Sequence, residues 1–251
     1  MLVDGKWTAD WDPVQAKDEK GRFVRQVSSF RHWVTPNGEA SPTGSEGFKA
    51  APGRYHLYVA LICPWASRTL MARKLKKLDD VISVTVVEPA LTDQGWRFGD
   101  FPGSGPDTLN GATYLHELYT RADPGYTGRA TVPVLWDKKR KTIVNNESSD
   151  ILRMLNSAFD TFGDATVDLY PQACRAEIDA LNKEIYEKLS NGVYKAGFAS
   201  SQAAYEEAVT DVFAMLDTLE GRLSDGRAFL FGDDLSATAG GHHLAPSRSG
   251  S

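Results

Sequence analysis

Cys63 is the residue whose type and position are best suited to chemistry. It follows an apolar run at 55–62 and precedes Pro64-Trp-Ala-Ser67, so a strand is expected to end and a helix to begin at this cysteine. Free N–H groups and the helix dipole at such a helix start stabilise negative charge, which lowers a thiol pKa and favours the thiolate nucleophile. The sequence therefore predicts sulfur chemistry at Cys63. The alternative interpretation is a buried cysteine at the end of a strand.

A second thiol is missing from this motif. A dithiol oxidoreductase of the Cys-x-x-Cys type would carry its resolving cysteine at position 66, which is Ala here. Cys174 lies far downstream in a stretch of helical pattern, where a cysteine is usually a small buried hydrophobe. We therefore expect a mobile small thiol such as glutathione to supply the second sulfur.

Pro133 stands at the start of an apolar run, directly after Val132. Proline is tolerated there at a strand start or edge, or with a cis peptide bond. A cis bond would leave the Val132 backbone able to pair with the cysteinyl part of a thiol peptide, as in β-augmentation. An ordinary edge-strand proline is the alternative interpretation.

Glu147 and Ser148 are expected to open a helix. Plain helix capping is one interpretation of this pair. A helix N-terminus also binds carboxylates, so Ser148 and the adjacent amides are candidates to hold a γ-glutamyl carboxylate. Glu147 could then accept a hydrogen bond from the neighbouring ammonium group.

The elements around these residues predict a thioredoxin-like arrangement. Apolar patterns indicate a strand at 55–62, a helix at 64–78 with Leu70, Leu75 and Leu78 on one face, and a parallel strand at 81–87. A loop-rich insertion is expected at 88–129. An antiparallel hairpin at 131–136 and 142–144 and a helix from 147 complete the β-α-β, β-β-α order.

A helical part is predicted to follow. Its first stripe comprises Ile178, Leu181, Ile185 and Leu189 and is expected to end in a C-cap at Asn191-Gly192. Ser200 or Ser201 can cap the second helix. Its expected apolar face consists of Val209, Val212, Phe213, Leu216, Leu219 and Leu223.

The composition narrows the function classes. The 251 residues are 41% hydrophobic and 24% charged, with a net charge of −5, so no basic surplus favours nucleic acid as a partner. No signal peptide or membrane span is expected, and two cysteines fit a reducing, cytoplasmic compartment. The five histidines show no metal-ligand spacing, and no metal site is predicted.

Five segments together resemble the glutathionyl-hydroquinone reductases, the Xi-class glutathione transferases. The resemblance runs from the first residues to about Gly232. The segments are Phe30-Arg-His-Trp-Val-Thr-Pro36, Cys63-Pro-Trp-Ala66, Gly95-Trp-Arg-Phe98, Thr131-Val-Pro-Val-Leu-Trp-Asp137 and Asn146-Glu-Ser148.

The resemblance implies a glutathione transferase fold, with an α/β thioredoxin-like N-terminal domain and an all-α C-terminal domain that is incomplete here. The expected divisions are an arm at 1–53, a glutathione-binding domain at 54–160, a partial helical domain at 172–232 and a disordered tail at 233–251. The family continues after position 233 with helices that carry a second substrate-side tyrosine. The tail of this chain has no apolar period, so a truncated or altered end is expected.

The resemblance also implies the site and the reaction. Cys63 would be the nucleophile, and Tyr194 would match the first of two tyrosines beside the aromatic substrate. The residues implied around glutathione, the co-substrate, are Trp96, Arg129, Val132, Glu147 and Ser148. Glutathione would be removed from glutathionyl-hydroquinones through a Cys63–glutathione mixed disulfide. The alternatives are an Omega-type thioltransferase or dehydroascorbate reductase and an impaired glutathione-binding chain, and homodimerisation stays open.

Overall fold

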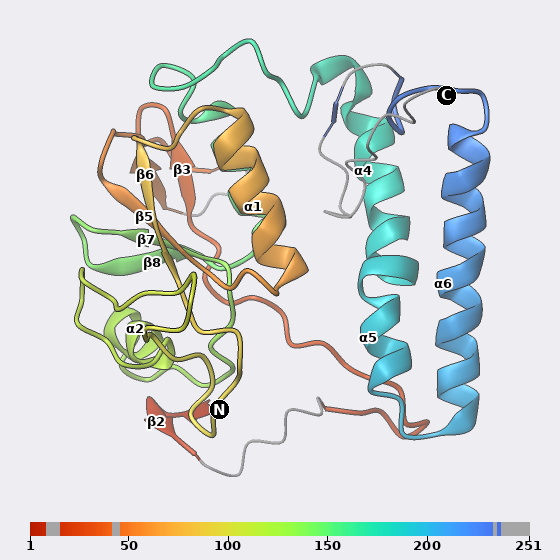
Figure 1. The fold of residues 1–251 in the computed structure, drawn as a ribbon, viewed down its shortest axis with the longest axis horizontal. Helices are drawn as coiled ribbons and strands as arrows, with labels where there is room; N and C mark the ends of the chain where they lie inside the picture. Colours follow the sequence, from red (N-terminus) through yellow and green to blue (C-terminus); the bar gives the residue numbers. More distant parts are fainter. Residues whose placement is uncertain (9–15, 42–45, 233–234, 237–251) are drawn as a thin grey trace. The chain divides into compact units, whose positions relative to one another are not determined.

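The structure is a computed structural model of residues 1–251, and it describes residues 1–8, 16–41, 46–232 and 235–236. The chain divides into two compact units (Figure 1). Unit 1 comprises the described residues of 1–11 and 26–167, and unit 2 comprises those of 12–25 and 168–251.

Unit 1 contains a four-stranded sheet with the order β6-β5-β7-β8. The strands are β5 (Tyr55–Val59), β6 (Ile82–Val86), β7 (Val134–Asp137) and β8 (Thr142–Asn145). β5 pairs with β6 in parallel across the helix α1 (Pro64–Leu75), and it pairs with β7 in antiparallel fashion. β7 and β8 form an antiparallel pair. The predicted β-α-β unit and the predicted hairpin are confirmed.

Strand β5 is buried on both faces along its whole length. The ring of Tyr55 meets Phe159 at 5.7 Å on one face, and Tyr58 meets Phe98 from the 88–129 segment at 5.4 Å on the other. The expected strand at 55–62 is wrong at its end, because β5 stops at Val59 and Leu61 is 57% exposed. The sheet therefore lies between helices and the long insertion.

Helices α1 and α3 (Ser148–Ser157) pack against each other. The expected leucine stripe of α1 is wrong: Leu70 and Leu75 are only half-buried, and Leu78 lies beyond the helix end. The buried face of α1 consists instead of Ala66, Arg68, Thr69 and Ala72. The small side chains on this face allow α1 and α3 to pack closely, and Arg68 is the one charged residue among them.

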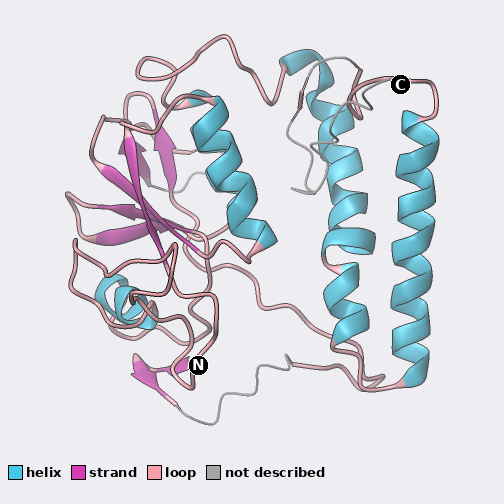
Figure 2. Ribbon diagram, in the orientation of Figure 1, coloured by secondary structure: helices cyan, strands magenta, loops and turns pink. Residues whose placement is uncertain are grey.

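The 88–129 segment is not entirely loop. It contains the helix α2 (His116–Ala122), which the sequence did not predict (Figure 2). Leu118 and Tyr119 are fully buried on this helix. Their burial in unit 1 stabilises a seven-residue helix that would be too short to persist alone.

The N-terminal arm forms short strands held by aromatic contacts. They are β1 (Leu2–Val3), β2 (Lys6–Trp7), β3 (Trp33–Thr35) and β4 (Gly47–Lys49). Trp7 stacks on His116 with ring centroids 4.6 Å apart, and Phe30 stacks on Tyr126 at 5.6 Å. These two rings hold the arm against the 88–129 segment.

Unit 2 is helical. It contains η1 (Gln172–Cys174), α4 (Arg175–Glu184), the π-helical segment η2 (Ile185–Ser190), α5 (Gly192–Gly197) and α6 (Gln202–Leu223). The predicted cap is confirmed, because the Ser201 hydroxyl accepts a hydrogen bond from the Ala204 amide at 3.2 Å. The core of the unit comprises Leu181, Ile185, Met215, Leu219 and Leu230.

Two expectations for unit 2 need qualification. Asn191 is the C-cap of η2, as predicted, but its φ is −90° and Gly192 begins α5 directly, so the chain does not end its helical part there. A Cβ at Gly192 would lie 2.8 Å from Val212 Cγ2, so glycine serves the close approach of α5 and α6 here. Phe213 is 62% exposed and does not belong to the buried face of α6.

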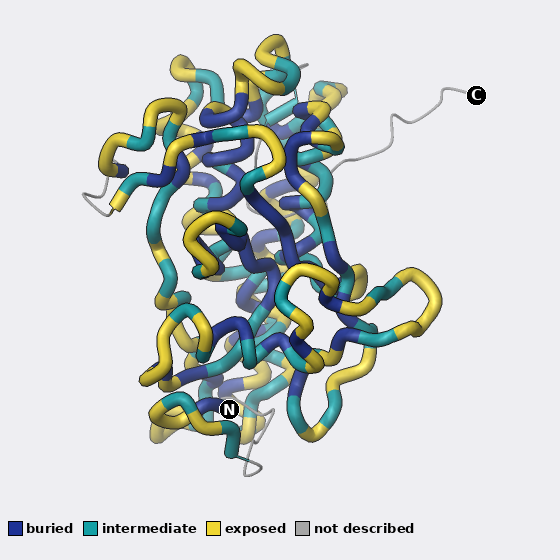
Figure 3. Tube along the Cα trace, turned by 90° about the vertical axis from the view of Figure 1, so that its left-hand side faces the viewer, coloured by how far each residue is buried: buried dark blue, intermediate teal, exposed yellow. Residues whose placement is uncertain are grey.

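Burial along the chain follows this arrangement. Figure 3 shows the buried stretches running through the regular elements and most exposed residues lying in the loops. The predicted disordered tail at 233–251 falls outside the described residues, apart from 235–236. No described helix is long and apolar enough to cross a membrane.

Candidate functional site

Cys63 is the N-cap residue of α1, with Pro64 in the first turn, as the sequence predicts. Its carbonyl accepts the amides of Ala66 and Ser67 at 3.1 and 3.0 Å, which begins the helix at this residue. The first turn carries no acidic side chain. The half-buried sulfur therefore lies where the helix dipole favours negative charge.

The Val132–Pro133 peptide bond is cis, which confirms one of the two interpretations of Pro133. The Cys63 Sγ lies 3.7 Å from the Val132 carbonyl oxygen and donates to it. Both Val132 and Pro133 are buried. The segment directly before β7 thus presents its backbone to the cysteine, from a position 69 residues downstream.

Tyr119 of α2 anchors this backbone. Its hydroxyl donates to the Thr131 carbonyl at 2.7 Å and accepts from the Thr131 amide and from Asn146 Nδ2, each at 3.1 Å. Burial raises the pKa of Tyr119 to about 12, so the phenol stays neutral and keeps its proton at physiological pH. The helix that the sequence missed therefore positions the residue next to Val132.

Glu147 and Ser148 open α3, as predicted. Glu147 is the N-cap residue, and its Oε1 accepts from the Ser149 amide at 3.3 Å. The buried Ser148 hydroxyl accepts from Arg68 Nε at 3.1 Å and from Arg68 Nη2 at 2.6 Å. Arg68 Nη2 also lies 3.7 Å from Glu147 Oε1. The capping interpretation of Glu147 is confirmed, and Arg68 is a contributor that the sequence did not indicate.

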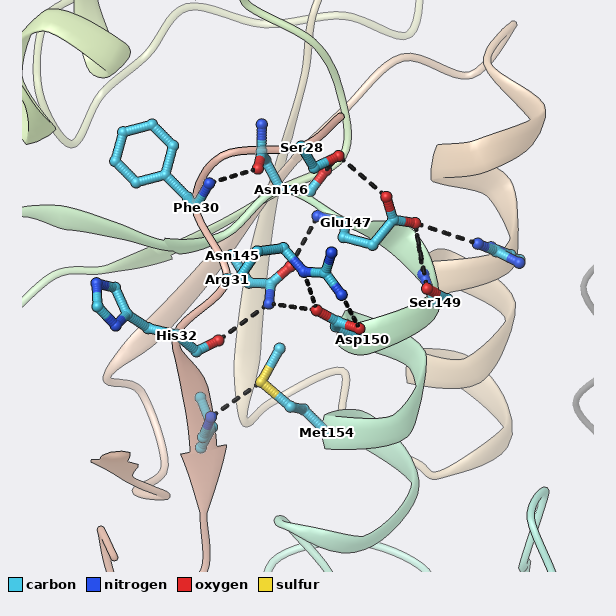
Figure 4. A network of polar contacts seen from close by, with 12 residues as sticks. Ser28, Phe30, Arg31, His32, Asn145, Asn146, Glu147, Ser149, Asp150 and Met154 are labelled. Carbon is cyan, nitrogen blue, oxygen red and sulfur yellow. Dashed lines mark hydrogen bonds and ion pairs between the residues drawn. The ribbon is translucent and has the colours of Figure 1, made fainter. Parts of the chain in front are cut away.

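The arm segment 28–34 runs beside the start of α3 (Figure 4). The Ser28 hydroxyl donates to Glu147 Oε2 at 3.0 Å. Arg31 donates to both carboxylate oxygens of Asp150, at 2.5 and 3.0 Å. The Ser28 contact holds the Glu147 carboxylate at the oxygen that Ser149 does not use, and the Arg31 contact ties the arm to α3.

Trp96 and Arg129 lie on loops of unit 1. The Trp96 carbonyl accepts from the Leu115 amide at 2.9 Å, directly before α2. The Arg129 amide donates to Gln26 Oε1 at 3.1 Å, and its carbonyl accepts from the Tyr126 hydroxyl at 3.0 Å. Both backbones are held by the insertion and the arm.

Tyr194 lies in unit 2, on α5. The Arg25 guanidinium covers its ring, with the guanidinium carbon 4.4 Å from the ring centroid. Arg25 Nε also donates to Asn191 Oδ1 at 2.6 Å, which fixes the stacked geometry. Pro133 and the remaining predicted site residues belong to unit 1. These residues are Cys63, Trp96, Arg129, Val132, Glu147 and Ser148.

Neither cysteine forms a disulfide. Cys174 is half-buried and lines a cavity with Glu177, Arg222 and Phe231, so its expected full burial is wrong. It is the last residue of η1 and the N-cap residue of α4. Within the described ranges, no group of three or more His, Cys, Asp or Glu side chains could hold a metal ion.

Comparison with known families agrees with this geometry. The family model of the glutathione S-transferase N-terminal domain matches residues 62–158, and that of the C-terminal domain matches residues 202–239. The matched N-terminal range contains Cys63, Val132, Glu147 and Ser148.

Individual relatives are similar over most of the chain. Glutathionyl-hydroquinone reductase YqjG of Escherichia coli is 52% identical over 94% of this chain and 71% of its own length. Glutathionyl-hydroquinone reductase PcpF of Sphingobium chlorophenolicum is 48% identical over the same two shares.

Solved structures of glutathione transferases have a similar fold. The glutathione-bound structure of Escherichia coli YqjG has a TM-score of 0.83 at 49% identity, covering 94% of this chain and 70% of that one. The glutathione S-transferase Xi of Phanerochaete chrysosporium has a TM-score of 0.82 at 46% identity, covering 89% and 72%. The chain combines a thioredoxin-like sheet with a helical unit, and its relatives are similar to it over most of its length. It therefore belongs to the glutathionyl-hydroquinone reductases, the Xi class of the glutathione transferase superfamily.

Proposed function

We propose that this chain removes glutathione from glutathionyl-hydroquinones and that Cys63 is its nucleophile. The observation that carries the proposal is the Cys63 sulfur at the start of α1, 3.7 Å from the Val132 carbonyl that precedes the cis proline. A thiolate at this place has backbone beside it that can pair with a cysteinyl peptide. The relatives named glutathionyl-hydroquinone reductase support the substrate class.

The reaction needs two exchanges at one cysteine. The Cys63 thiolate attacks the glutathione sulfur of the substrate, forming an S–S bond as the sulfur–ring carbon bond breaks. The electron pair of the broken bond remains on the ring carbon, which takes up a proton, and the hydroquinone leaves. A second glutathione thiolate then attacks the glutathione sulfur bound to Cys63, releasing glutathione disulfide and the Cys63 thiolate.

The residues at the start of α3 fit the γ-glutamyl end of glutathione. The Ser148 hydroxyl donates no hydrogen bond among the described residues, and it is therefore available to a carboxylate. Glu147 Oε2 accepts only from Ser28 within that same part of the chain and can accept from the ammonium group. Trp96 and Arg129 complete the proposed glutathione site, and Val132 pairs with the cysteinyl residue.

Tyr194 is proposed to act on the aromatic ring. Its phenol hydrogen-bonds or protonates the phenolic oxygen of the leaving hydroquinone, which helps the ring to accept electrons. The cation over its ring holds the side chain in one orientation. The substrates are thus glutathione and glutathionylated aromatic compounds, and the two free thiols suit the cytoplasm.

Turnover and intact mass test the proposal together. The purified protein is incubated with a glutathionyl-hydroquinone and excess glutathione, while free hydroquinone is followed by chromatography and the protein by mass spectrometry. We expect turnover and a transient gain of one glutathione, and both should disappear in Cys63→Ser. Cys174→Ser is the matched control and should retain both. Turnover by Cys63→Ser would refute the proposed nucleophile.

An Omega-type thioltransferase is the second candidate, because the same cysteine could attack other disulfides or dehydroascorbate. A relative from Schizosaccharomyces pombe named glutathione S-transferase omega-like 2 is 47% identical over 91% of this chain. Competition between a glutathionyl-hydroquinone and dehydroascorbate distinguishes the two. The proposal requires the higher kcat/KM for the glutathionyl-hydroquinone.

A further inference from the structure

Arg68 is a buried cation at the start of α3, although it belongs to α1. It is 5% exposed, and its side chain crosses to the first residue of α3. A buried guanidinium is costly unless its N–H groups are satisfied. Two of them, on Nε and Nη2, are used on the single hydroxyl of Ser148.

This double contact decides what the Ser148 hydroxyl can do. A serine hydroxyl has one hydrogen to donate and two lone pairs to accept with. At 3.1 and 2.6 Å, the two Arg68 groups occupy both lone pairs. Ser148 is 3% exposed, so water does not compete freely for the oxygen. Ser148 is therefore restricted to donating its hydrogen.

A donor-only hydroxyl beside a helix N-terminus suits one kind of ligand group. A carboxylate offers acceptors on both oxygens, so it can take the Ser148 hydrogen and a backbone N–H together. A carboxamide offers only one acceptor, and its NH₂ would face donors and stay unpaired. Binding of the carboxamide therefore leaves a polar group unpaired, which costs binding free energy, whereas binding of the carboxylate does not.

We propose that Arg68 is a specificity-determining residue that makes Ser148 select the α-carboxylate of a γ-glutamyl ligand over the corresponding carboxamide. The inference rests on the proposed glutathione site. It adds the reason why this site binds a charged carboxylate in preference to a neutral carboxamide. Arg68 acts through Ser148 and is a positioning residue. Lysine does not reproduce the planar two-donor contact, so one Ser148 lone pair would become free to accept from an amide N–H.

The test compares two ligands that cannot exchange disulfides. The probes are S-methylglutathione and its analogue with the glutamyl α-carboxylate converted to a carboxamide, and their Kd values are measured by titration calorimetry. We expect the unmodified protein to prefer the carboxylate by roughly ten- to a hundredfold. Arg68→Lys should reduce this ratio to less than about threefold.

Two further variants separate specificity from folding. Ser148→Ala removes the donor, and it should also abolish the preference; because it also removes the acceptor of two Arg68 N–H groups, its fold is checked by circular dichroism. Arg73→Lys is the matched control on α1, because Arg73 donates to Asp79 and to the Ile82 carbonyl instead, and it should keep the full ratio. A merely structural role for Arg68 would weaken both ligands equally and leave the ratio unchanged, which would overturn the inference.

The outcomes for the unmodified protein also separate the two proposals. Binding of both probes with equal Kd would overturn the selection by Arg68 and leave the glutathione site standing. Binding of neither probe would overturn the glutathione site and the selection with it. A preserved preference in Ser148→Ala would show that the hydroxyl does not reach the ligand, and would likewise overturn the inference.

Discussion

His56 in β5 links the stability of the sheet to pH. It is 3% exposed, and its two ring nitrogens contact the hydroxyls of Ser83 and Thr85 on β6 at 2.7 and 2.9 Å. Burial, with a smaller contribution from the nearby Lys138 cation, lowers the pKa of His56 from 6.5 to about 4. The charge of Asp107 opposes this shift only in part.

The sign and size of the effect follow from this difference. The unfolded chain binds a proton at His56 as the pH falls through 6.5, whereas the folded chain does not bind it until about pH 4. Folding stability is therefore complete above pH 6.5 and is lost as the pH falls toward 4. The loss attributable to His56 is about 2 kcal/mol between about pH 7 and pH 5, and it approaches about 3 kcal/mol at lower pH.

Urea unfolding followed by tryptophan fluorescence measures this loss in unit 1. All six tryptophans lie at or before position 136, and Trp136 itself is paired with His56 across β5 and β7. His56→Gln removes the titration, and comparing the two proteins cancels every other titrating group. We expect the unmodified protein to lose about 2 kcal/mol more than the variant between about pH 7 and pH 5. Equal losses would refute the reasoning, because His56 would then titrate alike in both states.

Three more predictions concern packing and caps. Asp137→Asn breaks the buried pair with Arg54, whose Nη2 lies 2.5 Å from Asp137 Oδ2, and should reduce the urea stability of unit 1 by about 3 kcal/mol in the same fluorescence assay. Gly192→Ala should lower the thermal stability of the helices by about 1–2 kcal/mol by circular dichroism, and adding Val212→Ala should recover part of this loss. Ser201→Ala should lower it by about 1 kcal/mol, whereas Ser201→Asp should retain the cap.

The sequence was sufficient to predict those features whose geometry is determined by residues nearby in the chain. Pro64 at the first helical position indicated that Cys63 lies at a helix start, and the hairpin was predictable in the same way. For Val132–Pro133 the local sequence left two interpretations, one of which was the cis bond. Helix α2 was not readable, because it is short and lies between Gly- and Pro-containing loops. Its stability comes from the burial of Leu118 and Tyr119, which is a tertiary effect.

Contacts between distant segments of the chain could not be predicted from the sequence. Arg68 on a helix normally indicates a solvated position, and nothing nearby in the chain marks its partner 80 residues downstream. Asn-Gly is typical of a helix end, and Asn191 is indeed the C-cap of η2. The packing reason for Gly192, its close approach to Val212 on α6, could not be predicted for a related reason.

The charges at the start of α3 suit the proposed glutathione site, where one place has to recognise both signs of an amino-acid head group. The Glu147 carboxylate alone would repel an incoming carboxylate at the helix N-terminus. Arg68, 3.7 Å from Glu147 Oε1, offsets that charge while filling the lone pairs of Ser148. Glu147 Oε2, directed by Ser28, is left to accept from an ammonium group, and Ser148 is left to donate to a carboxylate. One buried guanidinium thereby separates the site into an acceptor half and a donor half, which is the pattern that a zwitterionic γ-glutamyl group requires.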